Sequence, residues 1–169
     1  MDSRPSGGGD KAGRQQRAQE IRDALRTVNS QLSLLSQRVG GHLELRGADF
    51  LCLDLIGLHG SLSPSALARL SGLHPATMTG IIDRLERDGW ITRERDPDDR
   101  RGVVLHPVAG RRADVLMLFA GMSARMAEVC ADYSDAELDL IAGFLRRTAE
   151  AGSAAVAQLD ADRPSPGAG

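Results

Sequence analysis

Residues 74–88 carry hydroxyl and cationic side chains in a segment with helical spacing. Hydrophobic side chains recur there three and four positions apart, which predicts an amphipathic helix that buries Met78, Ile81, Ile82 and Leu85. The opposite face carries small, hydroxyl and charged side chains: Thr77, Thr79, Gly80, Asp83, Arg84 and Arg87. Short hydroxyl side chains let a helix approach base edges closely, and arginine reaches bases or phosphates, so the pattern indicates a helix that contacts DNA.

The segments on either side of this helix predict a winged helix-turn-helix. Ser63 and Pro64 are typical of the cap and first position of a short helix, which is expected to end at Gly72. Gly89 is expected to end the DNA-contacting helix. Residues 90–105 then read as two short strands joined by a charged turn, which is the pattern of a wing. Two helices joined by a tight glycine turn and followed by a wing define this motif.

Residues 63–110 resemble the DNA-binding domain of the MarR family of bacterial transcriptional regulators. The resemblance rests on Leu67-Ala68-Arg69-Leu70, Thr77-Met78-Thr79, Ile82-Asp83-Arg84-Leu85-Glu86-Arg87-Asp88-Gly89 and, most specifically, Arg93-Glu94-Arg95-Asp96-Pro97-Asp98-Asp99-Arg100-Arg101. With the flanking helices it covers about residues 14–158. The family usually leaves its wing through Leu-Thr-x-x-Gly, whereas residues 105–110 read Leu-His-Pro-Val-Ala-Gly. We therefore expect a shorter second wing strand.

The resemblance implies a sequence-specific, DNA-binding transcriptional regulator that acts as a repressor on a pseudo-palindromic operator. It also implies a homodimer and a small-molecule effector, phenolic or aromatic in some relatives, bound between the dimer helices and the winged domain. The expected DNA-binding residues are Ser65, Thr77, Met78, Thr79, Arg84, Arg95, Asp99, Arg100 and Arg101. Arg101 matches the wing arginine that enters the minor groove, where the negative potential is enhanced, and Asp99 matches the acid that holds the wing in shape. No cofactor and no metal are expected.

Several of these residues have a structural alternative. For Arg84, an ion pair with Asp88, four residues later, has the same weight as a phosphate contact. For Arg95 and Arg100, a solvated side chain has nearly the same weight. Solvated hydroxyls are the alternative for Thr77 and Thr79, but the start of a DNA-contacting helix favours contact.

Long amphipathic helices flank the predicted winged domain. The first spans residues 14–39, with Gly40-Gly41 expected to end it, and Asp49 can cap a second helix that is apolar around much of its circumference. After the wing we expect a helix over residues 108–133 and another that begins at a capping box, Ser134 with Glu137. These helices exceed what a small winged domain needs, so we expect them to pair with a second copy. A two-fold dimer separates the recognition helices by roughly 34 Å, one turn of DNA.

The expected fold class is mainly α with a small two-stranded β wing: a winged helix-turn-helix with long terminal dimerisation helices. At 169 residues the chain suffices for one substantial core. The expected division is a disordered tail (1–13), an N-terminal dimerisation helix and loop (14–46), the winged domain (47–107), C-terminal dimerisation helices (108–158) and a second disordered tail (159–169). Within the winged domain, the recognition helix covers about residues 74–88 and the wing about residues 91–106.

The distribution of charge supports a DNA partner more than the total does. The formal net charge is −2, but residues 84–112 contain eight arginines and six acids, whereas residues 113–169 contain four arginines and nine acids. Cations are therefore concentrated at the proposed DNA face. The first 13 residues contain no apolar leader, and no apolar run approaches transmembrane length, so a cytoplasmic location is expected.

Other classes of function have less support. Cys52 and Cys130 could make a redox-responsive regulator, although buried structural cysteines are favoured in a reducing compartment. A protein-interaction module without DNA binding is supported only by the near-neutral charge. His42 with Glu44 is too sparse for a metal site. An enzyme is not expected, because no catalytic triad, phosphate-binding loop or metal-ligand cluster is recognisable.

Overall fold

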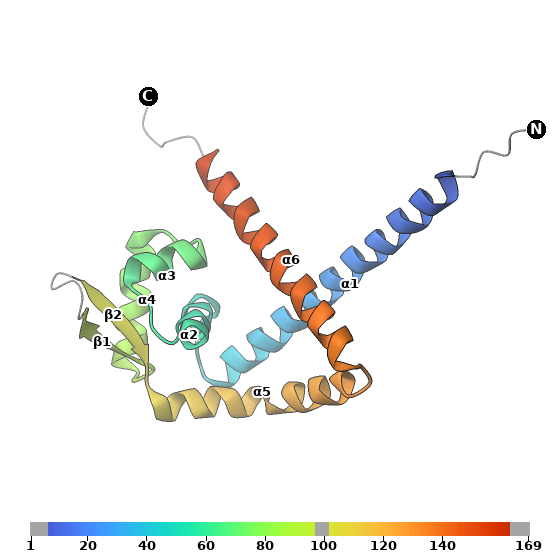
Figure 1. Cartoon of the computed structure of the whole chain (residues 1–169). Coiled ribbons are helices and arrows are strands. Elements are labelled where there is room, and N and C mark those ends of the chain that lie inside the picture. The colour runs from blue at the N-terminus through green and yellow to red at the C-terminus, as the bar shows by residue number, and fades with distance from the viewer. Residues whose placement is uncertain (1–6, 97–101, 163–169) are drawn as a thin grey trace, which may run out of the picture. The chain divides into compact units, whose positions relative to one another are not determined.

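The computed structural model describes residues 7–96 and 102–162 (Figure 1). The elements, in chain order, are α1 (Gly7–His42), α2 (Gly47–His59), α3 (Pro64–Ser71), α4 (Pro75–Arg87), β1 (Ile91–Arg95), β2 (Val103–Pro107), α5 (Ala109–Cys130) and α6 (Asp135–Ala161). The predicted fold class, mainly helical with a two-stranded wing, is confirmed. The chain divides into two compact units, residues 1–119 and 120–169, which are described separately.

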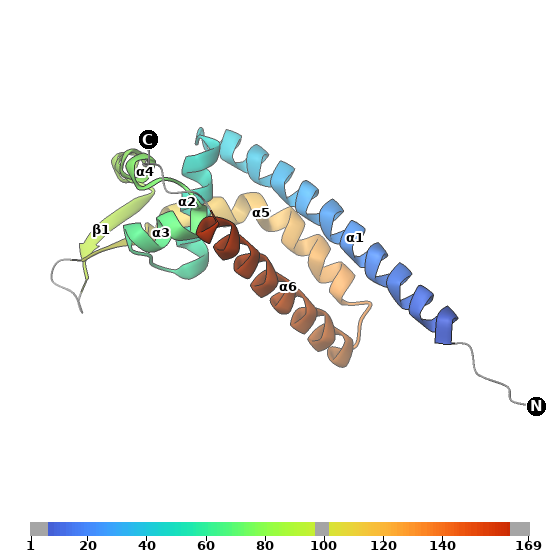
Figure 2. The ribbon, with the colours of Figure 1, turned by 90° about the horizontal axis from the view of Figure 1, so that it is seen from above.

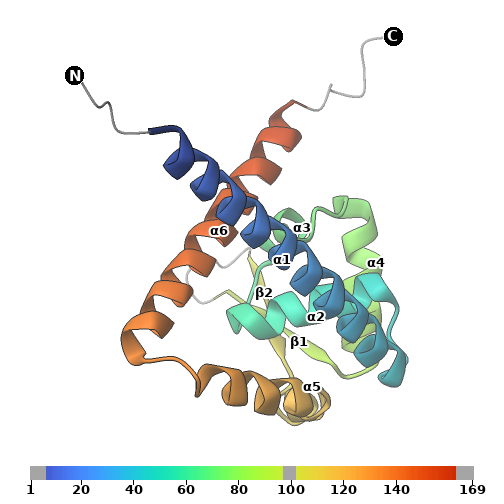
Figure 3. The same ribbon diagram turned by 90° about the vertical axis from the view of Figure 1, so that its right-hand side faces the viewer.

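The core of the first unit forms around α2. This helix contacts α1, α3, α4 and β2, as its largely apolar circumference predicts (Figure 3). The buried cluster consists of Cys52, Leu53, Ile56, Leu67, Met78, Ile81, Ile82, Leu85, Trp90, Ile91 and Leu105. Because this cluster draws on α2, α3, α4 and both strands, the helix-turn-helix and the wing share one hydrophobic core.

The helix-turn-helix begins and ends as the sequence predicts. The hydroxyl of Ser63 caps α3 by accepting a hydrogen bond from the amide of Ala66 at 3.2 Å, and Pro64 is the first helical residue. Gly72 ends α3 with φ of 67°, a left-handed conformation that a side chain would strain. His74 then caps α4, its Nδ1 accepting from the amide of Ala76 at 3.2 Å.

The wing is an antiparallel pair in which Ile91 pairs with Pro107 and Arg95 with Val103. β2 runs through Pro107, two residues beyond the predicted end at residue 105, and is as long as β1, five residues each. Proline is tolerated there because Leu105, two residues earlier, donates its amide to Leu62 and not to β1, so position 107 has no bond to β1 to lose. The amide of Val108 extends the pairing by donating to the carbonyl of Trp90 at 3.0 Å.

The predicted ends of the long helices need correction. α1 begins at Gly7, so residues 7–13 are helical rather than part of a disordered tail, and α6 continues past residue 158 to Ala161. Once a helix is nucleated, each added residue contributes one more hydrogen bond, so a helix extends readily into polar sequence. α1 also continues through Gly40-Gly41 to His42. A Cβ on Gly40 would lie 3.4 Å from the side chain of Phe50, so this glycine permits close packing of α2 rather than ending α1.

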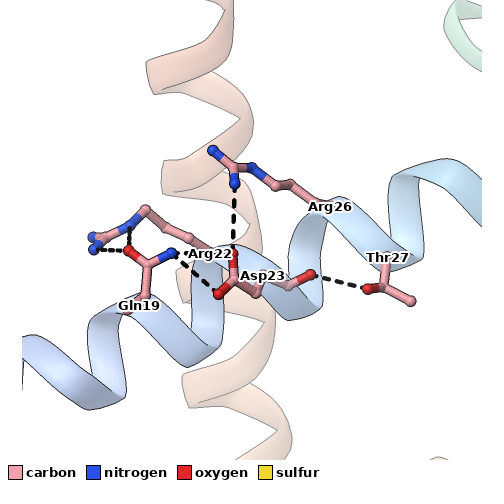
Figure 4. A network of polar contacts seen from close by, with 5 residues as sticks. All are labelled: Gln19, Arg22, Asp23, Arg26 and Thr27. Carbon is pink, nitrogen blue, oxygen red and sulfur yellow. Dashed lines mark hydrogen bonds and ion pairs between the residues drawn. The ribbon is translucent and has the colours of Figure 1, made fainter.

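Most of α1 is uncovered within the first unit, where it extends as one long helix (Figure 2). One side carries an exposed polar network, in which Gln19 accepts from Arg22 and donates to Asp23, Arg26 pairs with Asp23, and Thr27 donates to the Asp23 carbonyl (Figure 4). Such exposed contacts add little to helix stability. Apolar side chains of α1 are exposed as well: Ile21 by 44%, Val28 by 51% and Leu32 by 42%.

A buried ion pair joins α4 to α2. Arg84 donates from Nε to Oδ2 of Asp49 at 2.9 Å and from Nη2 to Oδ1 at 2.6 Å. The prediction that Asp49 caps α2 was wrong, because Arg46 occupies the cap position and Asp49 lies inside the first turn, with 5% of its side chain exposed. The alternative pairing of Arg84 with Asp88 is also not formed, since Asp88 pairs with Arg87. The two hydrogen bonds from Arg84 compensate for the desolvation of the Asp49 carboxylate. The two residues are 35 positions apart, so the sequence alone did not predict this pair.

Replacing Arg84 with methionine is expected to lower the midpoint of thermal unfolding by roughly 5–10 °C, because it leaves the Asp49 carboxylate buried without a partner. Arg87→Met, on the same helix, is the matched control: Arg87 is 68% exposed in its own ion pair, and a shift of no more than about 2 °C is expected. Adding Asp49→Leu to Arg84→Met should recover part of the loss. Equal shifts of the unfolding midpoint for Arg84→Met and Arg87→Met would contradict a stabilising role of the Arg84–Asp49 ion pair.

In the second unit, α6 begins directly after Ser134, as predicted, and the Glu137 side chain forms its half of the predicted capping box. The carboxylate of Glu137 accepts from the Ser134 amide at 2.9 Å and from the Ser134 hydroxyl at 2.6 Å. The hydroxyl and amide of Ser134 together lower the pKa of Glu137 below its usual value of 4.5.

Glu137→Ala should therefore destabilise the protein at pH 7, and the difference from the wild type should vanish in acid. A lowered pKa in the folded state stabilises the fold above the unfolded-state pKa, and this contribution is lost as pH falls through the folded-state value. Thermal unfolding at a series of pH values between 7 and about 3 measures this. The control is Glu150→Ala, an exposed carboxylate on the same helix. A difference between Glu137→Ala and the wild type that stays constant with pH would refute the role of the carboxylate.

Candidate nucleic-acid interface

The outward face of α4 carries the small and hydroxyl side chains that the sequence pattern predicted there. Thr77 and Thr79 are exposed, on either side of the buried Met78. Near the start of α4 the exposed residues are Pro75, Ala76, Thr77 and Thr79, so the exposed face carries no bulky side chain there. Such a surface allows close approach of a helix to a groove of DNA.

The other predicted contacts are placed differently from one another. Met78 is only 2% exposed, so its assignment as a DNA-binding residue was wrong; its helical spacing with Ile82 makes it a core residue. Ser65 is exposed in the first turn of α3, its hydroxyl 3.1 Å from that of Ser63. Arg95 is exposed at the end of β1. Asp99, Arg100 and Arg101 lie outside the described residues.

Arg84 is held within the protein rather than projected from it. Its two contacts with Asp49 engage Nε and Nη2, and its side chain is 27% exposed. The hydrogen bond with Asp49 raises the pKa of Arg84 above its usual range. In this geometry Arg84 fixes the orientation of α4 on α2.

One functional candidate was missed by sequence reasoning. Arg93, in the middle of β1, is bonded to Asp83, and its Nε lies 3.1 Å from Oε2 of Glu86; both acids belong to α4. The available signal was the i, i+3 spacing of Asp83 and Glu86, which places both carboxylates on one side of the helix. Nothing in the sequence identified the strand residue that pairs with them.

The described interface is not basic by itself. Between residues 74 and 96 the chain carries four arginines and five acids. Many of these acids have partners within the chain: Asp83 and Glu86 contact Arg93, Asp88 contacts Arg87, and Glu94 lies 3.8 Å from His106. Intramolecular pairing therefore decides how much negative charge this surface presents to a phosphate backbone.

A pocket of about 250 Å³ lies in the first unit, between α2, the base of the wing and the start of α5. Its lining is mostly apolar: Leu53, Gly57, Leu58, Trp90, Pro107, Val115 and Leu116, with Asp54, Arg111 and Arg112 as the charged members. The guanidinium of Arg111 stacks on the Trp90 ring at 4.4 Å from its centroid. Partial burial raises the pKa of the Asp54 carboxyl group.

The two cysteines have different environments. Cys52 is fully buried in α2, and burial, together with the charge of Asp49, raises the pKa of its thiol to about 11. A thiol that stays protonated and inaccessible reacts slowly with oxidants, which argues against Cys52 as a redox sensor. Cys130 is half-buried at the end of α5, in the second unit.

Within the described ranges, no cluster of three or more histidine, cysteine or acidic side chains could hold a metal ion. A search of the same residues found no helix both long and apolar enough to cross a membrane.

Comparisons with known proteins agree with this geometry. The model of the MarR family matches residues 47–103, from the start of α2 into β2. YcgE of Bacillus subtilis, an uncharacterized HTH-type transcriptional regulator, is 30% identical over 125 residues, covering 74% of this chain and 81% of that protein. The HTH-type transcriptional repressor YetL, also of Bacillus subtilis, is 32% identical over 84 residues, half of each chain.

A solved structure shows the same fold. A MarR family protein from Bacillus stearothermophilus superposes with a TM-score of 0.62 at 20% identity, covering 82% of this chain and 97% of that one. Together with the extent of the similarity to YcgE, the winged helix-turn-helix assigns the chain without ambiguity: it belongs to the MarR family of DNA-binding transcriptional regulators.

Proposed function

We propose that this regulator is a repressor that binds a pseudo-palindromic operator as a homodimer and is released by a small-molecule effector. The observation that carries the proposal is the exposed start of α4, where Thr77 and Thr79 flank a buried Met78 beside a wing rich in arginine. A helix of this kind enters the major groove, while a wing reaches the adjacent minor groove.

The contacts divide by their chemistry. Thr77 and Thr79 are the proposed readers of base edges or nearby phosphates, with Ser65 of α3 on the backbone. Arg95 is a proposed phosphate contact. Arg100 is a second proposed phosphate contact, and Arg101 is the proposed minor-groove residue, with Asp99 holding the wing in shape. Arg84 supports this surface from behind through Asp49.

Exposed apolar helix faces support the homodimer. α5 has no buried residue within the chain, and Leu116 is 59% exposed and Met117 75%. In the second unit, α6 exposes Leu140 by 74% and Phe144 by 42%. Apolar surface on this scale is costly in water, and a second copy that pairs the same helices removes it.

Repression is supported by one relative, since YetL is named a transcriptional repressor and is similar over half of each chain. The apolar pocket beside Trp90 is the proposed effector site. It adjoins both α5, which we assign to the dimer, and the base of the wing. A ligand bound there would favour a dimer whose recognition helices are wrongly spaced for the operator, and so weaken DNA binding by population shift.

Fluorescence anisotropy against DNA from the regulator's own upstream region tests operator binding. We expect tight binding that weakens steeply with salt, and weak binding of an unrelated duplex. Thr77→Ala with Thr79→Ala should weaken operator binding at least roughly fivefold, because up to two hydrogen bonds are lost. Thr27→Ala on α1 is the matched control and should have no effect. Arg101→Ala should cost on the order of 1 kcal/mol or more, and a loss under about threefold would count against its groove role.

Equal and weak binding of both duplexes would argue against a local operator and favour a winged helix that binds a protein instead. In that case the threonine variants and the wild type should be indistinguishable on DNA.

Filling the pocket tests the effector site. Gly57 lines it, and a Cβ there would meet nothing within 4 Å, so Gly57→Leu can place a side chain in the pocket without a backbone clash. We expect operator affinity within about twofold of wild type, and loss of release by aromatic acids and phenols that release the wild type. Gly41→Leu, in equally open space on α1, is the control and should keep the response. A full response in Gly57→Leu would remove the pocket from the proposal.

A further inference from the structure

Arg93 bridges the two parts of the molecule that have to meet DNA together. It lies in the middle of β1, opposite Leu105 of β2, and reaches two carboxylates one turn apart on α4. The planar guanidinium presents Nε and Nη2 along one edge, which suits two acceptors side by side. One side chain thereby joins the wing to the recognition helix.

The strand pattern explains why Arg93 points toward α4. Alternate residues of a strand share a face, so Arg93 lies on the same face of β1 as Ile91. Ile91 is 1% exposed in the core beneath α4, and Arg93 is the next residue outward on that face, with 34% of its side chain exposed. On this face of β1, Ile91 packs in the core and Arg93, two residues further along, forms ion pairs with α4 at the surface.

The acids that Arg93 engages lie where negative charge is most harmful to DNA binding. Asp83 is 57% exposed and Glu86 43%, and both flank the outward face of α4. With four arginines and five acids between residues 74 and 96, the described surface has no excess of cations to mask them. Without Arg93, two carboxylates would face the phosphate backbone uncompensated.

We propose that Arg93 is a positioning residue for operator binding, which neutralises Asp83 and Glu86 and ties the wing to α4 without itself contacting DNA. The inference rests on the proposed use of α4 and the wing in DNA binding. It differs from a phosphate contact in a measurable way. A phosphate contact is worth the same whether or not the two acids are present, whereas a neutralising contact loses its value when they are gone.

A double-mutant cycle on the full chain separates these possibilities. Operator affinity is measured for Arg93→Met in the wild-type background and in the background of Asp83→Asn with Glu86→Gln. We expect Arg93→Met to weaken binding at least about tenfold at low salt in the first background and less than about threefold in the second. The comparator is Arg95→Met, a proposed phosphate contact on the same strand, which should cost the same factor in both backgrounds.

Circular dichroism establishes that each variant is folded, and Arg93→Lys guards against loss of the fold in Arg93→Met. Lysine keeps the positive charge next to the two acids, so Arg93→Lys should bind within about threefold of wild type. An equal loss for Arg93→Met in both backgrounds, or Arg93→Lys as weak as Arg93→Met, would overturn this inference alone. A wild-type chain that binds no operator duplex would overturn the proposed function, and this inference with it.

Discussion

The orientation of α4 on α2 sets the position of every side chain on its exposed face. Its inner face is set by burial of four apolar side chains, but the hydrophobic effect is non-directional and does not by itself fix the rotation of the helix. The two-pronged contact between Arg84 and Asp49 removes that freedom, because the charged groups have to meet in one geometry while Asp49 is shielded from water. α4 can therefore present Thr77 and Thr79 in a fixed direction.

On its other side, α4 supplies the acidic partners of an ion pair with the wing instead of the basic one. Toward α2 the recognition helix supplies the cation, Arg84, whereas toward the wing it supplies the acids that meet Arg93. The first contact is buried and contributes mainly to stability. The second is partly exposed, so its contribution to stability is small and its effect on the surface charge is large. Ion pairs thus contribute to packing on one side of α4 and, in the proposed function, to recognition on the other.

The helices outside the winged domain impose a different constraint. α5 has no buried residue in the single chain, and apolar side chains of α1 and α6 are exposed along much of their length. A helix with an apolar face is stable in a protein when another surface covers that face and removes it from water. The winged domain completes its own core, whereas these helices leave apolar side chains exposed, which the proposed homodimer would cover. α5 begins directly after the wing, so in the proposed dimer a change in how two copies pair would reach the wing through this helix.

Local sequence determined the elements of this protein and much of its family character. Helical spacing predicted the buried face of α4, turn residues predicted the caps at Ser63 and Ser134, and the alternation after Gly89 predicted the wing; each depends on neighbours a few residues apart. Helix ends were less accurate at Gly7, at the Gly40-Gly41 pair and at Ala161, because helix extension and a close contact with Phe50 outweigh local preference. Which charged side chains form ion pairs is visible only in the folded chain. Arg84 pairs with Asp49, 35 residues away, and Arg93 of β1 pairs with Asp83 of α4. Such pairs depend on distance in space and leave no periodic pattern in the sequence from which they could be predicted.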